Sequence, residues 1–321
     1  MPNAPLKHMQ IAPYYWFDGE ISLREHVSVD PFAHGLHYGT GVFEGIRAYL
    51  TPRGPGIFRL REHMERFERS AAMYQLKLAW NVPALCAAIV ETLRRNELDS
   101  AYIRPLAFYG ERTISLAPCF FCPTHVLVAF RALGDYFGAG QALGIRTTIS
   151  SWRKFSSKAL PSTVKAAGHY ANSVLAMQDA VGRGFDEAIL LNDRGDVAEG
   201  TGENVFLVKD GVLRTNDRSA DVLHGITRGT VIELAHDLGI PLEITNITVT
   251  DLHEADEAFF TGTAVEVTPI ACIDEHVYPS ARPVTARLRA AYARAIAGED
   301  ERHPEWVTYV DAERPLTAAS Y

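Results

Sequence analysis

The chain has 321 residues, of which 47% are hydrophobic and 22% charged, and its formal net charge is −8. A chain of this length exceeds what one hydrophobic core usually serves, so we expect two folded domains. The acidic balance argues against a surface that binds nucleic acid or anionic lipid, and we expect small molecules as partners, with no nucleic acid and no membrane.

The chain contains four scattered cysteines: Cys86, Cys119, Cys122 and Cys272. So few thiols do not form a disulfide framework in a chain of this size, and they suit the reducing cytoplasm in which we expect the protein. Cys119 and Cys122 have neither a second pair nor a nearby histidine, so we interpret them as loop packing rather than a zinc or redox site. The N-terminus lacks the apolar run of a signal peptide, and we expect no membrane span.

The first part of the chain predicts an α+β arrangement. Aromatic residues that run into Asp-Gly are typical of a hairpin, and apolar residues at steps of three and four indicate an amphipathic helix with its charges on the far face. In chain order we expect a hairpin turning at Asp18-Gly19, helices over residues 58–76 and after Pro83, and strands over residues 101–110 and 124–133.

A glycine-rich segment at residues 133–144 fits neither the helix nor the strand period, and it marks the expected domain boundary. We therefore predict a small N-terminal α+β domain at 1–135, a linker at 136–144 and a larger C-terminal domain at 145–321.

The second part alternates predicted strands and helices. We expect strands over residues 145–152, 187–193, 242–249 and 257–270, a hairpin at 204–215 turning at Asp210-Gly211, and helices at 169–184, 227–239 and 284–298, the last as a terminal helix.

Two glycine-containing turns in this part offer backbone N–H groups to an anion. Gly225 precedes the helix expected from Thr227, and Gly262 follows an apolar strand and precedes Thr263. Free N–H groups at the first turn of a helix, together with its dipole, favour phosphate binding. Either turn alone is a weak signal, and the two together favour a phosphate cradle.

Glu199 and Glu203 lie beside glycines at the start of a predicted strand. Such a carboxylate is either a solvated loop charge or the acid that keeps a pyridinium nitrogen protonated. Upstream of it, we interpret Lys154 and Lys158 as ordinary solvated charges, as most lysines are. Lys165 completes a set of phosphate cradle, ring-nitrogen acid and lysine, which are the requirements of pyridoxal 5′-phosphate (PLP).

Seven motifs follow one another over roughly residues 14 to 297: HGLHYGTGVFEGIRAY, FRLREHMERF, AYIRPL, ALPSTVKAAGHYANS, AEGTGENVFLV, GITR and TGTAVEVTP. In this order they resemble the class IV, fold type IV PLP aminotransferases, and most of all the branched-chain amino acid aminotransferases. The resemblance implies a two-domain α+β fold in which the small N-terminal domain is followed by a larger pseudo-barrel domain that anchors PLP, with the cofactor between the domains. It also implies a homodimer or a larger assembly built from dimers.

The resemblance implies that Lys165 is the catalytic residue, which forms a Schiff base with PLP and moves the substrate proton. Glu199 would pair with the pyridine nitrogen, Tyr170 with the phenolic oxygen, and Arg59 would clamp the phosphate. Taken from residues alone, Arg59 is a surface charge and Tyr170 a half-buried helix residue. The implied cofactor-binding set is Arg59, Lys165, Tyr170, Glu199, Gly202, Asn204, Ile226, Thr227 and Thr263. Small residues around Lys165 would let the flat ring approach the backbone.

The implied substrate site uses the N–H groups of Thr263 and Ala264 and the hydroxyl of Tyr102 for the α-carboxylate. Arg104 would bind the distal carboxylate of glutamate. The apolar pocket would be walled by Tyr38, Phe43 and Tyr136, although each aromatic is as compatible with an ordinary core position. The cluster of His26, His34, His37 and Asp30 suggests a metal, but the family motif accounts for these histidines and we expect no metal.

The sequence therefore predicts transamination between a branched-chain or other apolar L-amino acid and 2-oxoglutarate, in ping-pong half-reactions. The alternatives within the class are a D-amino acid or (R)-amine transaminase and an aminodeoxychorismate lyase. A binding module, or a metal-dependent hydrolase that uses the histidines, is the alternative from another class. The loop at 111–123 lacks the family's glycine-rich pattern and His224 replaces a common proline, so the preferred amino acid stays open.

Overall fold

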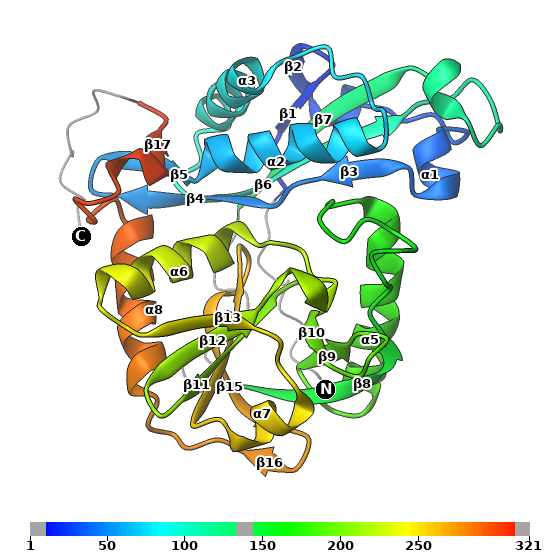
Figure 1. Cartoon of the computed structure of the whole chain (residues 1–321). Helices are drawn as coiled ribbons and strands as arrows, with labels where there is room; N and C mark the ends of the chain where they lie inside the picture. The colour runs from blue at the N-terminus through cyan, green and yellow to red at the C-terminus, as the bar shows by residue number, and fades with distance from the viewer. Residues whose placement is uncertain (1–10, 133–143, 312–321) are drawn as a thin grey trace. The chain divides into compact units, whose positions relative to one another are not determined.

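The computed structural model describes residues 11–132 and 144–311 (Figure 1). The described chain forms two compact units. The N-unit comprises residues 11–132, 164–168 and 294–311, and the C-unit comprises residues 144–163 and 169–293. The domain ranges inferred from the sequence stay a prediction, and the expected linker lies outside the described residues except for Gly144.

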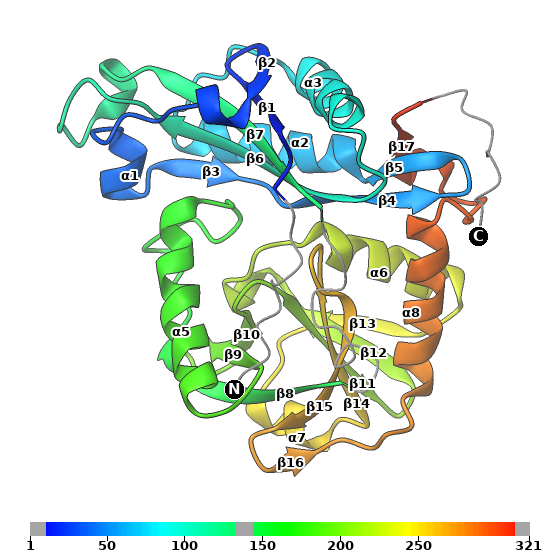
Figure 2. The ribbon, with the colours of Figure 1, turned by 180° about the vertical axis from the view of Figure 1, so that it is seen from behind.

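The N-unit is built on one antiparallel sheet of eight strands, in the order β17-β5-β4-β6-β7-β1-β2 with β3 also paired to β6. Its elements are β1 (Tyr14–Phe17), β2 (Glu20–Leu23), η1 (Arg24–His26), α1 (His34–Tyr38), β3 (Gly41–Phe43), β4 (Ile46–Thr51), β5 (Gly54–Phe58), α2 (Leu60–Met73), α3 (Val82–Arg95), β6 (Ala101–Tyr109), η2 (Pro118–Phe120), β7 (Thr124–Arg131), η5 (Pro304–Trp306) and β17 (Val307–Tyr309). The helices α2 and α3 pack together along this sheet (Figures 1 and 2).

The elements expected in the N-unit are present, and four strands were missed. The β1–β2 hairpin turns at Asp18 and Gly19, both with positive φ. Strands β3, β4, β5 and β17 were not expected. Two glycines and Pro55 fill the start of β5, and these residues weaken a strand signal.

Helix α2 buries two kinds of residue. Its apolar face, which includes Met64 and Phe67, enters the main core of the N-unit. His63, Arg66 and Ser70 are buried as well, so the expectation that all charges of this helix face solvent is wrong for His63 and Arg66. The spacing of the apolar residues located the helix. It could not show that a second row of buried side chains, His63, Arg66 and Ser70, finds polar partners elsewhere in the fold.

The short segment 164–168 is held against strand β3 as an extra piece of extended chain. Ala166 forms a bridge with Val42, and the N–H of Gly168 donates to the carbonyl of Gly39 at 3.1 Å. Gly39 has φ of +64°, and a Cβ placed on it would lie 2.8 Å from the Cα of Gly168. Both the backbone conformation and this close approach therefore require glycine at position 39.

The C-unit contains a nine-stranded mixed sheet, in the order β10-β9-β8-β15-β14-β11-β12-β13 with β16 also paired to β15, curled into an open half-barrel (Figure 2). Its elements are β8 (Ile145–Arg153), η3 (Ala167–His169), α5 (Tyr170–Gly182), β9 (Glu187–Leu191), β10 (Val197–Gly200), β11 (Asn204–Lys209), β12 (Val212–Asn216), η4 (Arg218–Ala220), α6 (Ile226–Asp237), β13 (Leu242–Thr245), α7 (Val249–Glu254), β14 (Glu257–Gly262), β15 (Glu266–Ile273), β16 (His276–Val277) and α8 (Pro283–Ile296). Two elements cross the boundary between the units: residues 167–168 of η3 and residues 294–296 of α8 are counted with the N-unit. Helix α5 packs on β8 and β9, and α6 packs on β13 and β14. The expected α+β fold with a pseudo-barrel second part is confirmed.

Three expectations for this part need correction. The segment expected as one strand over 257–270 is a hairpin of β14 and β15, in which Glu266 has φ of +57°. The strand expected over 242–249 ends at Thr245, because Thr248 and Asp251 form a capping box that starts α7. The helix expected at the chain's end is α8, but β17 follows it.

No helix among the described residues is both long enough and apolar enough to cross a membrane.

Phe67 offers a test of the N-unit core because it is fully buried on α2. We expect Phe67→Ala to lower the free energy of unfolding by about 3–5 kcal/mol, since it removes a large side chain and leaves a cavity. Met73 lies on the same helix and is 58% exposed, so Met73→Ala is the matched control and should change stability far less. Urea unfolding followed by circular dichroism measures both, and equal effects would contradict this description of α2.

Candidate active site

The backbone of Lys165 is fixed from two sides within the N-unit. Its N–H donates to the Ser70 hydroxyl of α2 at 3.3 Å, and its carbonyl accepts from the N–H of Phe43 at 3.0 Å. Ala166 is fully buried beside it. The small residues around Lys165 therefore have a structural reason, which is the close packing of this segment on β3, beyond the ring approach proposed from the sequence.

The side chain of Lys165 lies with three of the residues predicted to bind substrate. Its Nζ is 5.1 Å from the centre of the Phe43 ring, and the Arg104 guanidinium carbon is 4.6 Å from the same ring centre. An Arg104 nitrogen donates to the Tyr102 hydroxyl at 2.6 Å. Phe43 is buried, whereas Arg104 is exposed and able to meet a solute. An amine, an apolar ring and a guanidinium thus share one small region.

A buried charged cluster, which the sequence analysis missed, lies next to Lys165. Glu44 is fully buried, and its carboxylate accepts from Arg66 at 2.7 and 2.8 Å and from His63 Nδ1 at 2.8 Å. Burial raises the pKa of Glu44, but Arg66 and His63 outweigh it and hold that pKa well below its usual range. Burial lowers the pKa of His63, so its ring is neutral and donates from Nδ1.

The amine of Lys165 is shifted toward its neutral form. Burial, followed by the positive charge of Arg66, lowers its pKa from the usual 10.5 to about 8, while Glu44 and Tyr102 act in the opposite direction. A neutral amine is the nucleophilic and proton-accepting form of lysine. The covalent and proton-transfer roles implied for Lys165 need an amine that is unprotonated part of the time, and the lowered pKa meets that need.

Arg59 is placed by the first turn of α2 and by the chain's last described segment. It precedes the helix with φ of +52°, and its N–H donates to the carbonyl of Trp306 at 2.6 Å. The guanidinium lies 4.7 Å from the Trp306 ring and its Nε 2.5 Å from a Glu62 oxygen. With 11% of its side chain exposed, Arg59 is not the free surface charge that residues alone suggest.

Two predicted pocket aromatics are not part of this group in the described structure. Tyr38 is 45% exposed on α1, and its hydroxyl donates to the carbonyl of Ile114 at 3.4 Å. Tyr136 lies outside the described residues. His34 uses its two ring nitrogens on the Thr40 hydroxyl and the Ser115 carbonyl.

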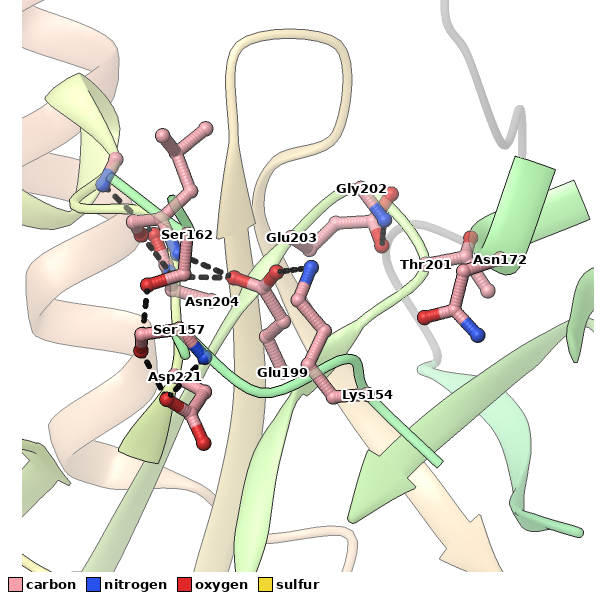
Figure 3. Close-up of polar contacts among 12 residues, drawn as sticks. Lys154, Ser157, Ser162, Asn172, Glu199, Thr201, Gly202, Glu203, Asn204 and Asp221 are labelled. Atoms are coloured by element: carbon pink, nitrogen blue, oxygen red, sulfur yellow. Dashed lines mark hydrogen bonds and ion pairs between the residues drawn. The ribbon is translucent and has the colours of Figure 1, made fainter. Parts of the chain in front are cut away.

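In the C-unit, Glu199 is a buried and fully oriented carboxylate (Figure 3). One of its oxygens is 2.6 Å from the amine of Lys154, and the other accepts from the N–H of Leu223 at 3.1 Å. The interpretation of Lys154 as a solvated charge is wrong, because this side chain is only 9% exposed. The opposite charges lie on β10 and at the end of β8, and only tertiary pairing joins them.

Asn204 connects this carboxylate to the N-terminus of α6 (Figure 3). Its amide nitrogen donates to Glu199 at 3.3 Å and to the Leu223 carbonyl at 2.8 Å, and its oxygen accepts from the N–H of Gly225 at 3.1 Å. A Cβ on Gly225 would lie 2.2 Å from that oxygen, so only glycine fits there. Asn204, expected as a cofactor residue, is placed to position both Glu199 and the first turn of α6.

The helix α6 begins at Ile226, as the sequence predicted to within one residue. Its N-cap is Gly225, which has no side chain to accept hydrogen bonds from the N–H groups of the first turn. Thr227 is buried in that turn. The N–H groups of such a turn, with the helix dipole, favour an anion.

The structure also locates three other residues of the predicted site. Thr263 and Ala264 are half-buried in the β14–β15 turn, and Tyr170 is half-buried at the start of α5.

Two further carboxylates, Glu187 and Glu203, accept hydrogen bonds from the turn that contains Gly202. Burial raises the pKa of Glu187 to about 7, while hydrogen bonds from the neighbouring backbone act in the opposite direction. Glu187 also accepts from the N–H groups of Ala188 and Thr201, and Glu203 from that of Gly202 at 2.9 Å. The sequence named Glu203 but gave no signal for Glu187.

Comparison with known proteins assigns the family. The family model Amino-transferase class IV matches residues 41–273. A branched-chain-amino-acid aminotransferase of Pseudomonas aeruginosa is 42% identical over 92% of this chain and 96% of its own, and one of Escherichia coli strain K12 is 40% identical over 94% and 98%.

Solved structures agree with this assignment. The branched-chain amino acid aminotransferase of Escherichia coli superposes with a TM-score of 0.91 at 39% identity, covering 94% of this chain and 100% of that one. The enzyme of Thermobaculum terrenum in its PLP form gives 0.88 at 34% identity, covering 94% and 99%. The family inferred from the ordered motifs is confirmed: the chain belongs to the class IV aminotransferases, enzymes that transfer amino groups with PLP.

Proposed function

We propose that this aminotransferase moves an amino group between a branched-chain L-amino acid and 2-oxoglutarate. The observation that carries the proposal is the group of Lys165, Phe43 and Arg104 in the N-unit, with ring distances of 5.1 and 4.6 Å. It offers one amine for proton transfer, one apolar surface for an aliphatic side chain and one guanidinium for a second carboxylate. The relatives named as branched-chain enzymes support the same substrate class.

The residues present fit PLP. Glu199 is a carboxylate held by Lys154 and by a backbone N–H group, and a protonated ring nitrogen requires such an acidic partner. The N-cap of α6 is a glycine, so no N-cap side chain occupies the N–H groups of the first turn, and these groups favour a phosphate. PLP supplies an aldehyde carbon and an electron-withdrawing ring that stabilises negative charge at the substrate Cα. We infer that Glu199 keeps the ring nitrogen protonated, and that Ile226, Thr227, Thr263 and Arg59 bind the phosphate. Asn204 and Gly202 position these groups, and Tyr170 bonds the phenolic oxygen.

Lys165 is the proposed proton carrier. With a pKa of about 8, its amine would be neutral often enough to accept the proton from the substrate Cα and, once protonated, to donate it to the carbon that the PLP aldehyde supplies. The backbone bonds to Ser70 and Phe43 hold its Cα in place, so that the movement needed is that of the side chain alone.

The substrate roles follow the same groups. Tyr102 and the N–H groups of Thr263 and Ala264 bind the α-carboxylate, and Arg104 binds the distal carboxylate of glutamate. The ring of Phe43 contacts an aliphatic side chain, and Tyr38 and Tyr136 are proposed as further walls of that pocket. The relatives named above are branched-chain enzymes, which favours this function over the alternatives within the class, a D-amino acid or (R)-amine transaminase and a lyase.

A second copy of this chain is the partner we propose for one apolar surface of the N-unit. Helix α1 and the loop 111–121 lie at the same end of the N-unit and are joined by the bond from His34 to Ser115 (Figures 1 and 2). The exposed apolar patch on these two segments, together with Phe32 just before α1, comprises Phe32, Leu36, Tyr38, Ile114, Leu116, Phe120 and Phe121. A monomer rarely exposes so many large apolar side chains together, and the sequence motifs imply a dimer.

We also infer a reducing compartment, the cytoplasm, from the four cysteines, all of which are free thiols.

Replacement of Lys165 tests the proposed function. We expect Lys165→Ala to abolish amino transfer from L-leucine, L-isoleucine and L-valine to 2-oxoglutarate, because the amine that carries the proton is removed. The near-ultraviolet absorbance of bound PLP should change as well. The matched control is Lys158→Ala, which removes an exposed lysine seven residues away and should leave both unchanged. Full turnover by Lys165→Ala, or a parent enzyme that uses only the D-donors of the same panel, would refute the proposal.

Replacement of Arg104 tests the second half-reaction. We expect Arg104→Gln to lower kcat/KM for 2-oxoglutarate about 10- to 100-fold, because a charge-assisted bond of about 1.5–3 kcal/mol is lost. The 2-oxo acid of leucine has no distal carboxylate and serves as the internal control, with a far smaller change. Equal losses for both acids would show that Arg104 acts on the fold or on a shared step.

Replacement of Leu116 tests the dimer. Leu116 is 81% exposed within the patch, and Leu50 is 62% exposed on β4, outside it. We expect Leu116→Glu to shift the protein from dimer to monomer in sedimentation velocity, because a charge would be buried in the interface. Leu50→Glu should remain dimeric. A parent protein that sediments as a monomer would contradict the assignment of this surface.

A further inference from the structure

The last described strand of the chain lies beside the arginine that is proposed to bind the cofactor's phosphate. Strand β17 pairs with β5 in antiparallel register, and Val307 lies opposite Phe58 (Figure 1). The pairing continues one residue further, because the N–H of Arg59 donates to the carbonyl of Trp306 at 2.6 Å. No step of the proposed chemistry uses this segment, yet Trp306 is 2% exposed and contacts Arg59 through both backbone and side chain.

Arg59 has a backbone conformation that its neighbours must maintain. Its φ is +52°, and it is the N-cap residue of α2, although its side chain forms no capping hydrogen bond. Residues other than glycine seldom adopt this left-handed conformation, which persists only where the surrounding structure holds it. The backbone bond to Trp306 supplies part of that restraint, and the side chain of Arg59 lies against the indole ring of the same residue.

The Trp306 ring contacts three side chains. The guanidinium carbon of Arg59 lies 4.7 Å from the ring centre, and the imidazole of His303 is stacked on the indole at 3.8 Å with 3° between the planes. Phe58 meets the ring edge-on at 6.0 Å between centres. The ring is therefore a fixed surface for the guanidinium. A cation–π contact is strongest when its partners are desolvated, and the side chain of Arg59 is only 11% exposed.

Two partners of the Arg59 guanidinium differ in charge. Glu62 lies 2.5 Å from Nε, and its carboxylate would repel a phosphate that binds to the same guanidinium. The face of an indole ring attracts a guanidinium without carrying a net charge. Trp306 can therefore hold the arginine in position without repelling an incoming anion.

We propose that Trp306 is a positioning residue, whose ring, fixed by His303 and Phe58, holds the guanidinium of Arg59 where it binds the phosphate of PLP. The inference rests on the proposed role of Arg59, and it gives a function to β17, a strand that was not expected from the sequence. A tryptophan that served only the core would affect every ligand alike. A tryptophan that acts through Arg59 affects only ligands with a phosphate.

The test compares two ligands that differ only in that group: PLP and pyridoxal, which has a hydroxyl in place of the phosphate. The full-length protein is stripped of cofactor and titrated with each, and the near-ultraviolet absorbance gives the two dissociation constants. The Kd for pyridoxal divided by the Kd for PLP is the phosphate-specific affinity. Circular dichroism confirms that each variant is folded.

The expected losses follow from the cation–π contact. In Trp306→Leu the phosphate-specific affinity should fall about 5- to 30-fold, whereas pyridoxal should bind within about twofold of the parent. Trp306→Phe keeps a smaller aromatic face and should lose less. Arg59→Gln should lose at least as much as Trp306→Leu. Once Arg59 is replaced by Gln, adding Trp306→Leu should change the phosphate-specific affinity by no more than about twofold.

A second replacement of Trp306 keeps the shape of the side chain. The analogue 5,6,7-trifluorotryptophan, incorporated at position 306 alone, is close to tryptophan in size but has an electron-poor ring that attracts a cation less. We expect the phosphate-specific affinity to fall about two- to fivefold, with pyridoxal binding unchanged. This measurement decides the inference even if Trp306→Leu does not fold.

The matched control is Trp80→Leu. Trp80 is a half-buried tryptophan of the same unit, and its ring packs edge-on against that of Trp16 at 4.8 Å. Its replacement should leave the phosphate-specific affinity unchanged. Equal losses of PLP and pyridoxal binding in Trp306→Leu, an unchanged ratio in the fluorinated protein, or additive losses in the double variant would overturn the inference.

The proposed function fails separately. If Arg59→Gln leaves the phosphate-specific affinity unchanged, Arg59 does not bind the phosphate and the inference falls with that role. If Arg59→Gln lowers it and Trp306→Leu does not, the inference alone is refuted. A parent protein that shows every expected ratio but transfers no amino group from branched-chain donors would refute only the function.

Discussion

One constraint governs the N-unit: a lysine amine is buried at a position bordered by two arginines and a glutamate, and its pKa is lowered there. Charges inside a protein interact far more strongly than charges in water, so their net balance at this point decides the protonation of Lys165. The bidentate pair of Glu44 and Arg66 lies beside this lysine, and the burial of both partners keeps water from screening their charges. A buried pair of this kind contributes little net stability, which is consistent with a functional reason for its presence.

The backbone satisfies a matching requirement. The segment 164–168 is short and has little hydrophobic surface of its own, so its position depends on hydrogen bonds to β3 and α2. Those bonds require a close backbone approach, which explains glycine at position 39 and small residues around the lysine. Electrostatics and backbone packing therefore come from the same two elements, and a shift of α2 would disturb both at once.

In the C-unit, the corresponding feature is the fixed orientation of a buried carboxylate, Glu199. Glu199 is bonded on both oxygens, by Lys154 and by the N–H of Leu223. Asn204 ties the same carboxylate to Gly225 at the start of α6, so one amide side chain links the acid to the helix N-terminus. Glu187 and Glu203 accept hydrogen bonds from the backbone N–H groups of Thr201 and Gly202 in the adjoining turn. Lys154, Glu187, Glu199 and Asn204 are all buried, and each has a bonding partner, as buried polar groups require.

Much of this protein was determined by the sequence itself. Hydrophobic periods located α2, α3, α5, α6 and α8, Asp-Gly pairs located two hairpins, and the ordered motifs identified the family and singled out Lys165 and Glu199. The tertiary structure decided the rest, because periodicity reports which face of an element is apolar and says nothing about pairing between distant charges. Lys154 resembled any solvated lysine until β8 was placed beside β9 and β10, and Arg66 resembled an exposed helix charge until Glu44 was folded against it. Partners that are 45 and 22 residues apart meet only in the folded chain, and so only the fold could show which charges belong to the site.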